Sequence, residues 1–318
     1  MIQENVVLKP YTNYKIGGKA DYFIEATSEE ELCEAVLWAK KKHLPFFLLG
    51  GGTNIIVSDK GFQGVVIHNR FTDIHVTGVH AFFGSGAPVQ GVVDILIDRG
   101  LTGMEWAGGL PGSIGGAIHG NAGAFGGYIS QCLVEVRALS PSGHVYTISK
   151  QECGFQYRTS IFKEEDGWVI LGAFFEFQTG DKSVLQKKVD ELREWRRVRH
   201  PLEYGNCGSV FKRIAVDDLP VHLMSQHPDI TSAIRDNQVA IAYFIDQCGL
   251  KERSIGGAKI SEKHPNFFVN ATGDAQAQDI LMLINVAKHS VMKRYGICLE
   301  EEVEMIGFEN PLYYQRDF

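Results

Sequence analysis

The sequence predicts an α+β fold built in three units, and three observations support this expectation. Amphipathic helices alternate with apolar runs of strand length along the 318 residues. Hydrophobic residues make up 44% and charged residues 22% of the chain, which is typical of a globular protein. Glycine is enriched at 35 residues, and eleven of these fall between residues 100 and 127. Because glycine lets other groups approach the backbone, this cluster predicts ligand-binding loops between the regular elements.

The first unit is expected over residues 1–67. Ser28 precedes three glutamates, a pattern typical of a helix N-terminus, and the apolar spacing that follows predicts a helix to about residue 42. Apolar runs then predict three strands, at 45–49, 55–57 and 65–68.

The second unit is expected over residues 68–200. It begins with a predicted strand over 74–83, followed by a helix from Pro88 to residue 98. Alternating strands are expected between 134 and 177, and a strongly periodic helix over 183–200 ends before Pro201.

The third unit is expected over residues 201–318. A polar stretch at 214–237 precedes a predicted helix near 239–247. A longer helix is expected from Asp274, as its N-cap, to residue 295, and Gly296 is expected to end it. A final strand is expected over 297–306.

Composition disfavours several classes of partner. The net charge of −7 opposes binding to nucleic acid or an anionic membrane, and no apolar run approaches the roughly 20 residues that a membrane span needs. The six cysteines are far apart and the opening residues lack the features of a signal peptide, so we expect reduced thiols, no metal and a cytoplasmic protein. We also expect a monomer.

Two glycine-rich segments predict a cofactor site. Gly50-Gly51-Gly52 forms one, and residues 108–123 form the other. Successive backbone amides in such turns bind anions, so two of them favour a large phosphorylated ligand such as a dinucleotide. Neither the G-x-G-x-x-G nor the P-loop spacing is present, which argues against those two folds. From spacing alone, ordinary tight turns account for the glycines equally well.

Three polar residues are candidates for chemistry, although each could also have an ordinary structural role. Arg158 is either a solvated surface residue or a bidentate clamp for a carboxylate. Ser209 is either a turn residue or a proton donor, and as a weak acid it suits a strongly basic carbanion or enolate. Glu302 belongs to an acidic run, which is either solvated or presents one carboxylate to a site.

Seven segments, taken in order, point further. They are NYKIGG at 13–18, LGGGTNI at 49–55, GGLPGSIGGA at 108–117, NAGAFG at 121–126, YRTSIFK at 157–163, GSVFK at 208–212 and LEEEV at 299–303. Together they closely resemble the UDP-N-acetylenolpyruvoylglucosamine reductase (MurB) family. The resemblance spans nearly the whole chain.

The resemblance implies an FAD-binding fold of the vanillyl-alcohol-oxidase type. Its two α/β subdomains would be residues 1–67 and 68–200, and a C-terminal α/β substrate-binding domain would be residues 201–318. The implied FAD-binding residues are Gly50, Gly51, Gly52, Thr53, Asn54, Ile55, Gly108, Pro111, Gly112, Ser113, Gly115, Gly116, Ala117, Asn121, Ala122 and Gly123.

The resemblance also implies the reaction. NADPH would reduce the flavin, and the reduced flavin would reduce the enolpyruvyl ether of UDP-N-acetylglucosamine to UDP-N-acetylmuramate, in peptidoglycan precursor synthesis. Ser209 would protonate the substrate carbon, while Arg158 and Glu302 polarise the substrate carboxylate. Tyr157, Lys212 and Arg213 would contact the substrate, and the arginines between 193 and 199 are further candidates for a locally basic site.

Two alternatives remain open at the level of sequence. An oxidase of the same fold would reoxidise with oxygen in the absence of a sugar nucleotide. A non-catalytic protein that binds flavin or a UDP-sugar would bind without turnover.

Overall fold

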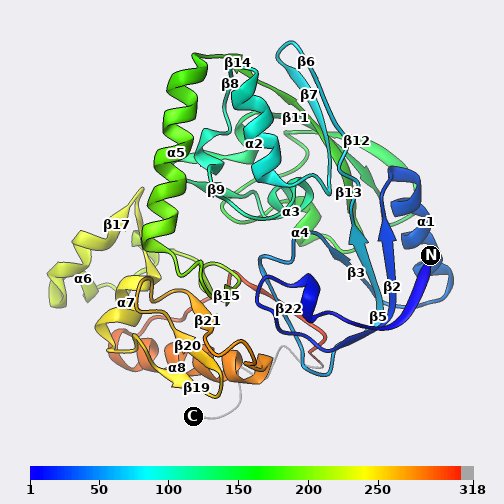
Figure 1. Cartoon of the computed structure of the whole chain (residues 1–318). Helices are drawn as coiled ribbons and strands as arrows, with labels where there is room; N and C mark the ends of the chain where they lie inside the picture. The colour runs from blue at the N-terminus through cyan, green and yellow to red at the C-terminus, as the bar shows by residue number, and fades with distance from the viewer. Residues whose placement is uncertain (309–318) are drawn as a thin grey trace. The chain divides into compact units, whose positions relative to one another are not determined.

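The computed structural model describes residues 1–308, in which the chain forms two compact units (Figure 1). Unit 1 comprises residues 1–6, 20–51 and 63–198, and unit 2 comprises residues 7–19, 52–62 and those from 199 onward. Unit 2 is therefore assembled from three separate stretches of chain. The three domains expected from sequence, with boundaries at 67 and 200, stay a prediction.

One layer of unit 1 is a four-stranded sheet covered by α1 (Glu29–Lys41), with strand order β1-β2-β5-β3. As predicted, α1 begins after Ser28, whose hydroxyl accepts a hydrogen bond from the Glu31 amide at 3.2 Å. Its apolar face packs with residues of β2 and β5 in one buried cluster. The strands are β1 (Ile2–Val7), β2 (Lys19–Ala26), β3 (Phe46–Leu49) and β5 (Phe62–Asn69).

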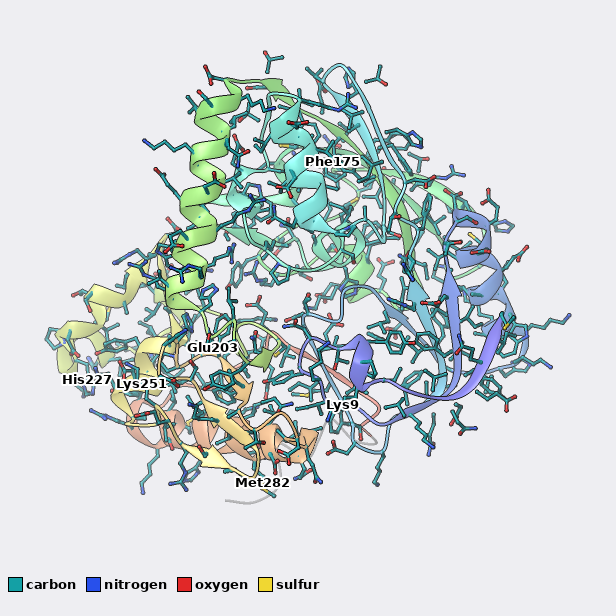
Figure 2. All side chains as sticks on the ribbon, in the orientation of Figure 1. Lys9, Phe175, Glu203, His227, Lys251 and Met282 are labelled. Atoms are coloured by element: carbon teal, nitrogen blue, oxygen red, sulfur yellow. The ribbon has the colours of Figure 1, made fainter. Side chains whose placement is uncertain are left out.

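The second layer of unit 1 is a five-stranded antiparallel sheet of order β12-β11-β13-β7-β6. Helices α2 (Val89–Asp98) and α3 (Ile114–His119) contribute to its core, in which Phe175 is 1% exposed (Figure 2). The strands are β6 (Ile74–Thr77), β7 (His80–Gly84), β11 (Leu133–Leu139), β12 (Val145–Ser149) and β13 (Val169–Glu176).

The single strand expected over 74–83 is wrong, because β6 and β7 form a hairpin there. Thr77 pairs with His80 across a two-residue turn, and Gly78 has φ 60°. A glycine with positive φ at the first turn position suits a tight hairpin, so the apolar run is folded back on itself.

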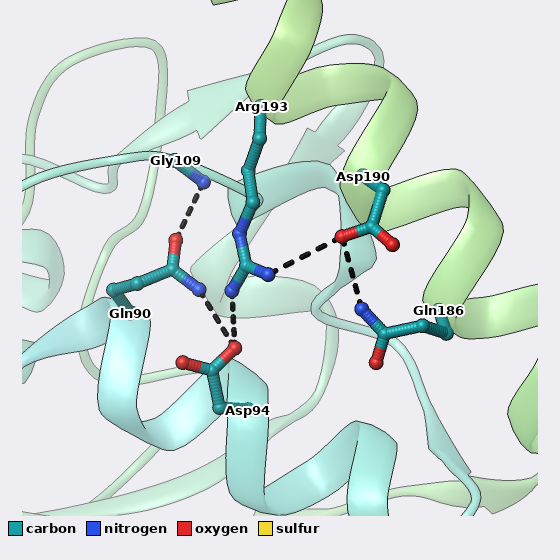
Figure 3. Close-up of polar contacts among 6 residues, drawn as sticks. All are labelled: Gln90, Asp94, Gly109, Gln186, Asp190 and Arg193. Atoms are coloured by element: carbon teal, nitrogen blue, oxygen red, sulfur yellow. Dashed lines mark hydrogen bonds and ion pairs between the residues drawn. The ribbon is translucent and has the colours of Figure 1, made fainter.

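Helix α5 (Lys182–Arg199) lies beside α2 in unit 1, and ion pairs join the two (Figures 1 and 3). Helix α2 starts one residue later than expected, since Pro88 is its N-cap and not its first residue. The remaining elements of unit 1 are β8 (Leu101–Thr102), η2 (Glu105–Ala107), β9 (Gly123–Ala124), β10 (Gly127–Tyr128), η3 (Ile129–Gln131), α4 (Ile161–Glu164) and β14 (Gln178–Thr179).

The core of unit 2 lies between α8 (Ala277–Tyr295), α7 (Ile241–Gln247) and a four-stranded antiparallel sheet of order β15-β21-β20-β19. The N-cap of α8 is Gln276 and not Asp274 as expected, because Asp279 accepts from the Gln276 amide at 3.0 Å in a capping box. The helix ends at Gly296, with φ 68°, as predicted. The strands are β15 (Gly205–Asn206), β19 (Ser254–Ile255), β20 (Ala258–Ile260) and β21 (Phe268–Asn270).

Unit 2 also contains a parallel pair formed by β4 (Ile55–Val57) and β22 (Glu304–Ile306). The final strand is thus shorter than the expected 297–306. The other elements of unit 2 are η1 (Lys9–Tyr11), β16 (Ile214–Ala215), η4 (Val216–Asp218), α6 (Leu223–Gln226), η5 (Pro228–Ala233), β17 (Ile234–Arg235) and β18 (Gln238–Val239). Across residues 1–308, no helix combines the length and the apolar character needed to span a membrane.

Candidate functional site

The first two residues of the first glycine segment, Gly50 and Gly51, lie against the second segment within unit 1. A Cβ atom on Gly51 would stand 2.9 Å from the Gly112 Cα, and one on Gly50 would collide with the Ser113 hydroxyl. Gly109 and Gly112 have φ of 74° and 114°, a region that other residues rarely adopt. The glycines therefore bring two backbone segments into direct contact, which isolated tight turns do not require.

The second segment continues into α3 and a left-handed turn. The Ser113 hydroxyl accepts from the Gly116 amide at 3.3 Å, and a Cβ on Gly115 would stand 2.8 Å from that of Ser85. Asn121, with φ 42°, donates through Nδ2 to the Gln156 carbonyl at 2.9 Å. Its buried Oδ1 has no hydrogen-bond partner. The other predicted cofactor residues in this part of unit 1 are Gly108, Pro111, Ala117, Ala122 and Gly123.

Arg158 lies beside this segment. Backbone hydrogen bonds between Gln156 and Thr159 close a turn in which Arg158 has φ 58°. Its Nη1 donates to the Gly123 carbonyl at 3.3 Å, and its guanidinium carbon lies 5.3 Å from the centre of the Tyr157 ring. A non-glycine residue in this conformation costs about 1–3 kcal/mol, a form of strain that clusters at functional sites.

Ser209 lies in unit 2 on a segment held by two asparagines. Asn206 Oδ1 accepts from the Gly208 amide at 3.0 Å. Asn266 clips Phe211, accepting from its amide at 3.1 Å and donating to its carbonyl at 2.9 Å. Ser209 itself is half-buried, and its hydroxyl has no hydrogen-bond partner within residues 1–308. The protein thus fixes the backbone and leaves the hydroxyl available.

Glu302 lies next to this segment in unit 2. Its amide donates to the Val210 carbonyl at 2.8 Å, and its carbonyl accepts from Asn54 Nδ2 at 3.0 Å. The structure therefore brings Ser209, Glu302 and Asn54 together, three residues predicted from distant parts of the sequence. Gly52, Thr53 and Ile55 also belong to unit 2, whereas Arg158 belongs to unit 1.

The buried thiol of Cys207 lies two residues before Ser209 in the sequence. Burial raises the pKa of Cys207 to about 12, opposed by the hydrogen bond with Tyr14 and reinforced by the nearby Glu302 charge. A thiol with such a pKa is protonated at neutral pH and is therefore a poor nucleophile. The reactive role of this segment therefore stays a prediction for the Ser209 hydroxyl and does not extend to the thiol.

Several cations expected to form a basic site are neutralised by acidic neighbours. Lys212 is ion-paired with Glu300. Arg193 bridges Asp94 of α2 and Asp190 of α5, in a network that also includes Gln90, whose Oε1 accepts from the Gly109 amide at 2.6 Å (Figure 3). Arg197 pairs with Glu194 at 2.6 Å. Arg196 differs from them because it is buried and has no acidic partner within residues 1–308.

The residues present fit a flavin dinucleotide better than a metal. Orphaned buried polar atoms in the described residues are Asn121 Oδ1, Arg196 Nη2 and His264 Nδ1, and the first two belong to or contact the second glycine segment. Within residues 1–308, no group of three or more His, Cys, Asp or Glu is arranged to hold a metal ion.

Sequence reasoning missed the two asparagines that hold the Ser209 segment. Asn266 is 55 positions from Phe211, and nothing in its local sequence marks it as a partner. Arg196 was grouped with neighbouring arginines because the sequence does not show which of them is buried. Helical spacing offered the only signal, since Arg196 lies seven residues after the core residue Val189.

Comparisons with known proteins match two parts of the chain to family models. Residues 20–149 match the family model described as an FAD binding domain. Residues 200–306 match the model described as the UDP-N-acetylenolpyruvoylglucosamine reductase C-terminal domain.

Full-length relatives agree. The UDP-N-acetylenolpyruvoylglucosamine reductase of Clostridium novyi is 35% identical, covering 97% of this chain and 93% of that protein. The UDP-N-acetylenolpyruvoylglucosamine reductase 2 of Bacillus anthracis is 36% identical, and the match covers 96% of this chain and 93% of that protein. The crystal structure of the Thermus caldophilus enzyme (MurB) is 27% identical with a TM-score of 0.76, covering 96% of this chain and all of that one.

These matches confirm three predictions made from the sequence: the vanillyl-alcohol-oxidase type of FAD-binding fold with a C-terminal domain, the flavin cofactor and the oxidoreductase class. The roles of individual site residues stay predictions. The chain belongs to the UDP-N-acetylenolpyruvoylglucosamine reductase family.

Proposed function

We propose that this protein uses NADPH to reduce the enolpyruvyl ether of UDP-N-acetylglucosamine to UDP-N-acetylmuramate, in cytoplasmic peptidoglycan precursor synthesis. The observation that carries the proposal is the segment around Ser209. Its backbone is clipped to Asn266 and to Glu302, while its hydroxyl has no hydrogen-bond partner in the described residues. A group held in this way suits proton transfer to a bound substrate.

Ser209 is assigned as the proton donor. Bound FAD supplies hydride transfer to the substrate double bond, and the carbon next to the carboxylate then needs a proton. A serine hydroxyl is a very weak acid, but it suffices when the acceptor is as basic as an enolate. The fixed Gly208–Val210 backbone keeps the hydroxyl in place without a side-chain partner that would compete for its proton.

Arg158 and Glu302 are assigned to the substrate carboxylate. Arginine offers planar paired donors that match a carboxylate and stabilise the charge that develops on it. The turn at 156–159 holds Arg158 in a left-handed conformation, and Asn54 fixes the backbone of Glu302. We assign Tyr157, Lys212 and Arg213 to substrate contacts and the two glycine segments to FAD.

The test measures the two half-reactions of the Ser209→Ala variant separately: flavin reduction by NADPH and flavin reoxidation by the substrate. Anaerobic bleaching of the flavin by NADPH should stay near the wild-type rate. Reoxidation by the enolpyruvyl sugar nucleotide should slow by about 10²–10⁴-fold, the usual contribution of a general acid. Ser254→Ala, at an exposed serine of unit 2, is the matched control.

Two results would contradict the proposal. An equal loss in both half-reactions would remove the proton-donor role of Ser209. Rapid oxidation by oxygen, with no turnover of the UDP-sugar, would instead indicate an oxidase.

A further inference from the structure

Arg196 is a buried cation without a counter-charge. The residue is 8% exposed, and no carboxylate pairs with it among residues 1–308. Burial lowers its pKa from 12.5 to about 10, and no neighbouring charge offsets this effect. Burying an unpaired charge is costly, so a function other than stability must account for it.

Arg196 contacts Gly108, where the second glycine segment begins, and Phe125, two residues beyond its end. Its Nε donates to the Gly108 carbonyl at 2.9 Å, and a Cβ on Gly109 would stand 3.0 Å from its Cδ. Its guanidinium carbon lies 5.2 Å from the centre of the Phe125 ring. One side chain on α5 therefore fixes the beginning and the end of a segment that runs from Gly108 to Phe125.

Phe125 has an unusual backbone conformation, and its ring contacts the same helix. Its φ is 52°, its side chain is 47% exposed, and Trp195 packs edge-on against its ring at 5.0 Å. The strained backbone lies two residues after Gly123, whose carbonyl accepts from Arg158. The C-terminal end of α5 thus contacts the part of unit 1 that contains Arg158 and the second glycine segment.

One donor of Arg196 is left over. Its Nη2 is buried and has no hydrogen-bond partner among residues 1–308, although buried polar atoms in folded proteins are almost always paired. The Asn121 Oδ1 atom, in the segment that Arg196 braces, is also unpaired. These two open positions, one donor and one acceptor, are what a bound polar cofactor would satisfy.

We propose that Arg196 is a positioning residue for FAD: it braces the 108–125 segment through Nε and its guanidinium face, and its Nη2 donates to an acceptor oxygen of the bound cofactor. FAD binding then supplies a hydrogen-bond partner for Arg196 Nη2. The inference rests on FAD binding by this family and not on the substrate or reductant proposed above.

The experiment compares Arg196→Met with Arg197→Met. Met keeps much of the apolar stem at position 196 but removes the charge and all donors. Arg197 is exposed on the same helix and, in the described part of the chain, pairs only with Glu194, so its variant controls for the loss of one positive charge. Each protein is stripped of flavin, and FAD binding is followed by quenching of flavin fluorescence.

The expected result is a dissociation constant for FAD at least about tenfold higher in Arg196→Met, since hydrogen bonds to charged groups are among the stronger ones. Arg197→Met should bind FAD as wild type does. The melting temperature of flavin-free Arg196→Met should equal or exceed that of wild type, because an unpaired buried charge is gone. Adding FAD should raise the melting temperature of Arg196→Met by less than it raises that of wild type.

FAD affinity within about twofold of wild type would overturn the inference. A lower melting temperature without FAD, combined with an unchanged rise on adding FAD, would also overturn it by indicating a purely structural role. Should Arg196→Met not fold, Arg196→Gln, which keeps a donor for the Gly108 carbonyl, is judged by the same criteria. Failure of wild type itself to bind FAD would overturn both the cofactor and this inference.

Discussion

The Asn266 side chain provides a direct test of how the Ser209 segment is held. Asn266 is 5% exposed, and its amide group makes both side-chain hydrogen bonds to the backbone of Phe211, which is 1% exposed. Asn266→Ala would remove both bonds and leave a buried amide and a buried carbonyl unpaired. Asn266→Asp would keep the acceptor for the Phe211 amide, but it would replace the donor to the Phe211 carbonyl with a carboxylate oxygen.

The magnitude follows from the groups left unpaired. Each buried backbone group without a partner costs about 1–3 kcal/mol, so Asn266→Ala should lower the free energy of unfolding of unit 2 by about 2–6 kcal/mol. Asn266→Asp should cost at least as much, because it buries a negative charge beside a carbonyl oxygen. Gln226→Ala, at an exposed amide side chain of the same unit, should have little effect.

The assay uses the distribution of tryptophan. All four tryptophans, at positions 38, 106, 168 and 195, lie in unit 1. Urea unfolding of Asn266→Ala should show an early loss of far-UV circular dichroism that precedes the change in tryptophan fluorescence. FAD should still bind to the folded variant, while reoxidation by the sugar nucleotide slows. A urea midpoint for circular dichroism equal to that of wild type would refute the reasoning.

Two further predictions concern the glycine contact and a buried histidine. Gly51→Ala would place its Cβ 2.9 Å from the Gly112 Cα, so we expect the segments to separate and FAD affinity to fall, measured by fluorescence titration; Gly91→Ala, where a Cβ meets nothing within 4 Å, is the control. Unchanged affinity in Gly51→Ala would contradict the expected steric conflict. Burial lowers the pKa of His264 from 6.5 to about 4. Between these values the unfolded chain binds a proton that the folded one does not, so stability should decline by up to about 3 kcal/mol as the pH falls from 6.5 to 4. His264→Phe should flatten this decline in urea midpoints, and an equally steep decline would contradict it.

The sequence was sufficient for elements whose signals are local. Ser28 followed by three glutamates predicted the start of α1, and Gly296 predicted the end of α8. The 55–57 strand was also predicted correctly, because a short apolar run between polar residues is typical of a buried strand. The 74–83 run failed because Gly78 lies within it, and apolar periodicity does not show where a chain reverses.

The candidate site was predictable only in part, because the side chains that hold its backbone are far from it in the sequence. The glycine segments and Ser209 were found by their residue types. The hydrogen bonds from Asn266 to Phe211 and from Asn54 to Glu302 join residues up to 248 positions apart, and no local pattern announces them. Arg196 and Arg197 are adjacent and identical in type, so only packing reveals that one is buried and the other paired at the surface.

The interleaved composition of unit 2 has a consequence for how the protein is made. Tyr14, Ile16 and Ile56 belong to the same apolar core as α7 and α8, and β4 takes β22 as its parallel neighbour. The stretches 7–19 and 52–62 leave the ribosome long before the C-terminal residues that pack around them. They can therefore reach their buried positions only when synthesis is almost finished. A fragment covering 200–306 alone would lack those three side chains. Expression of that fragment should therefore yield an aggregation-prone polypeptide, and supplying the N-terminal stretches on the same chain should rescue it.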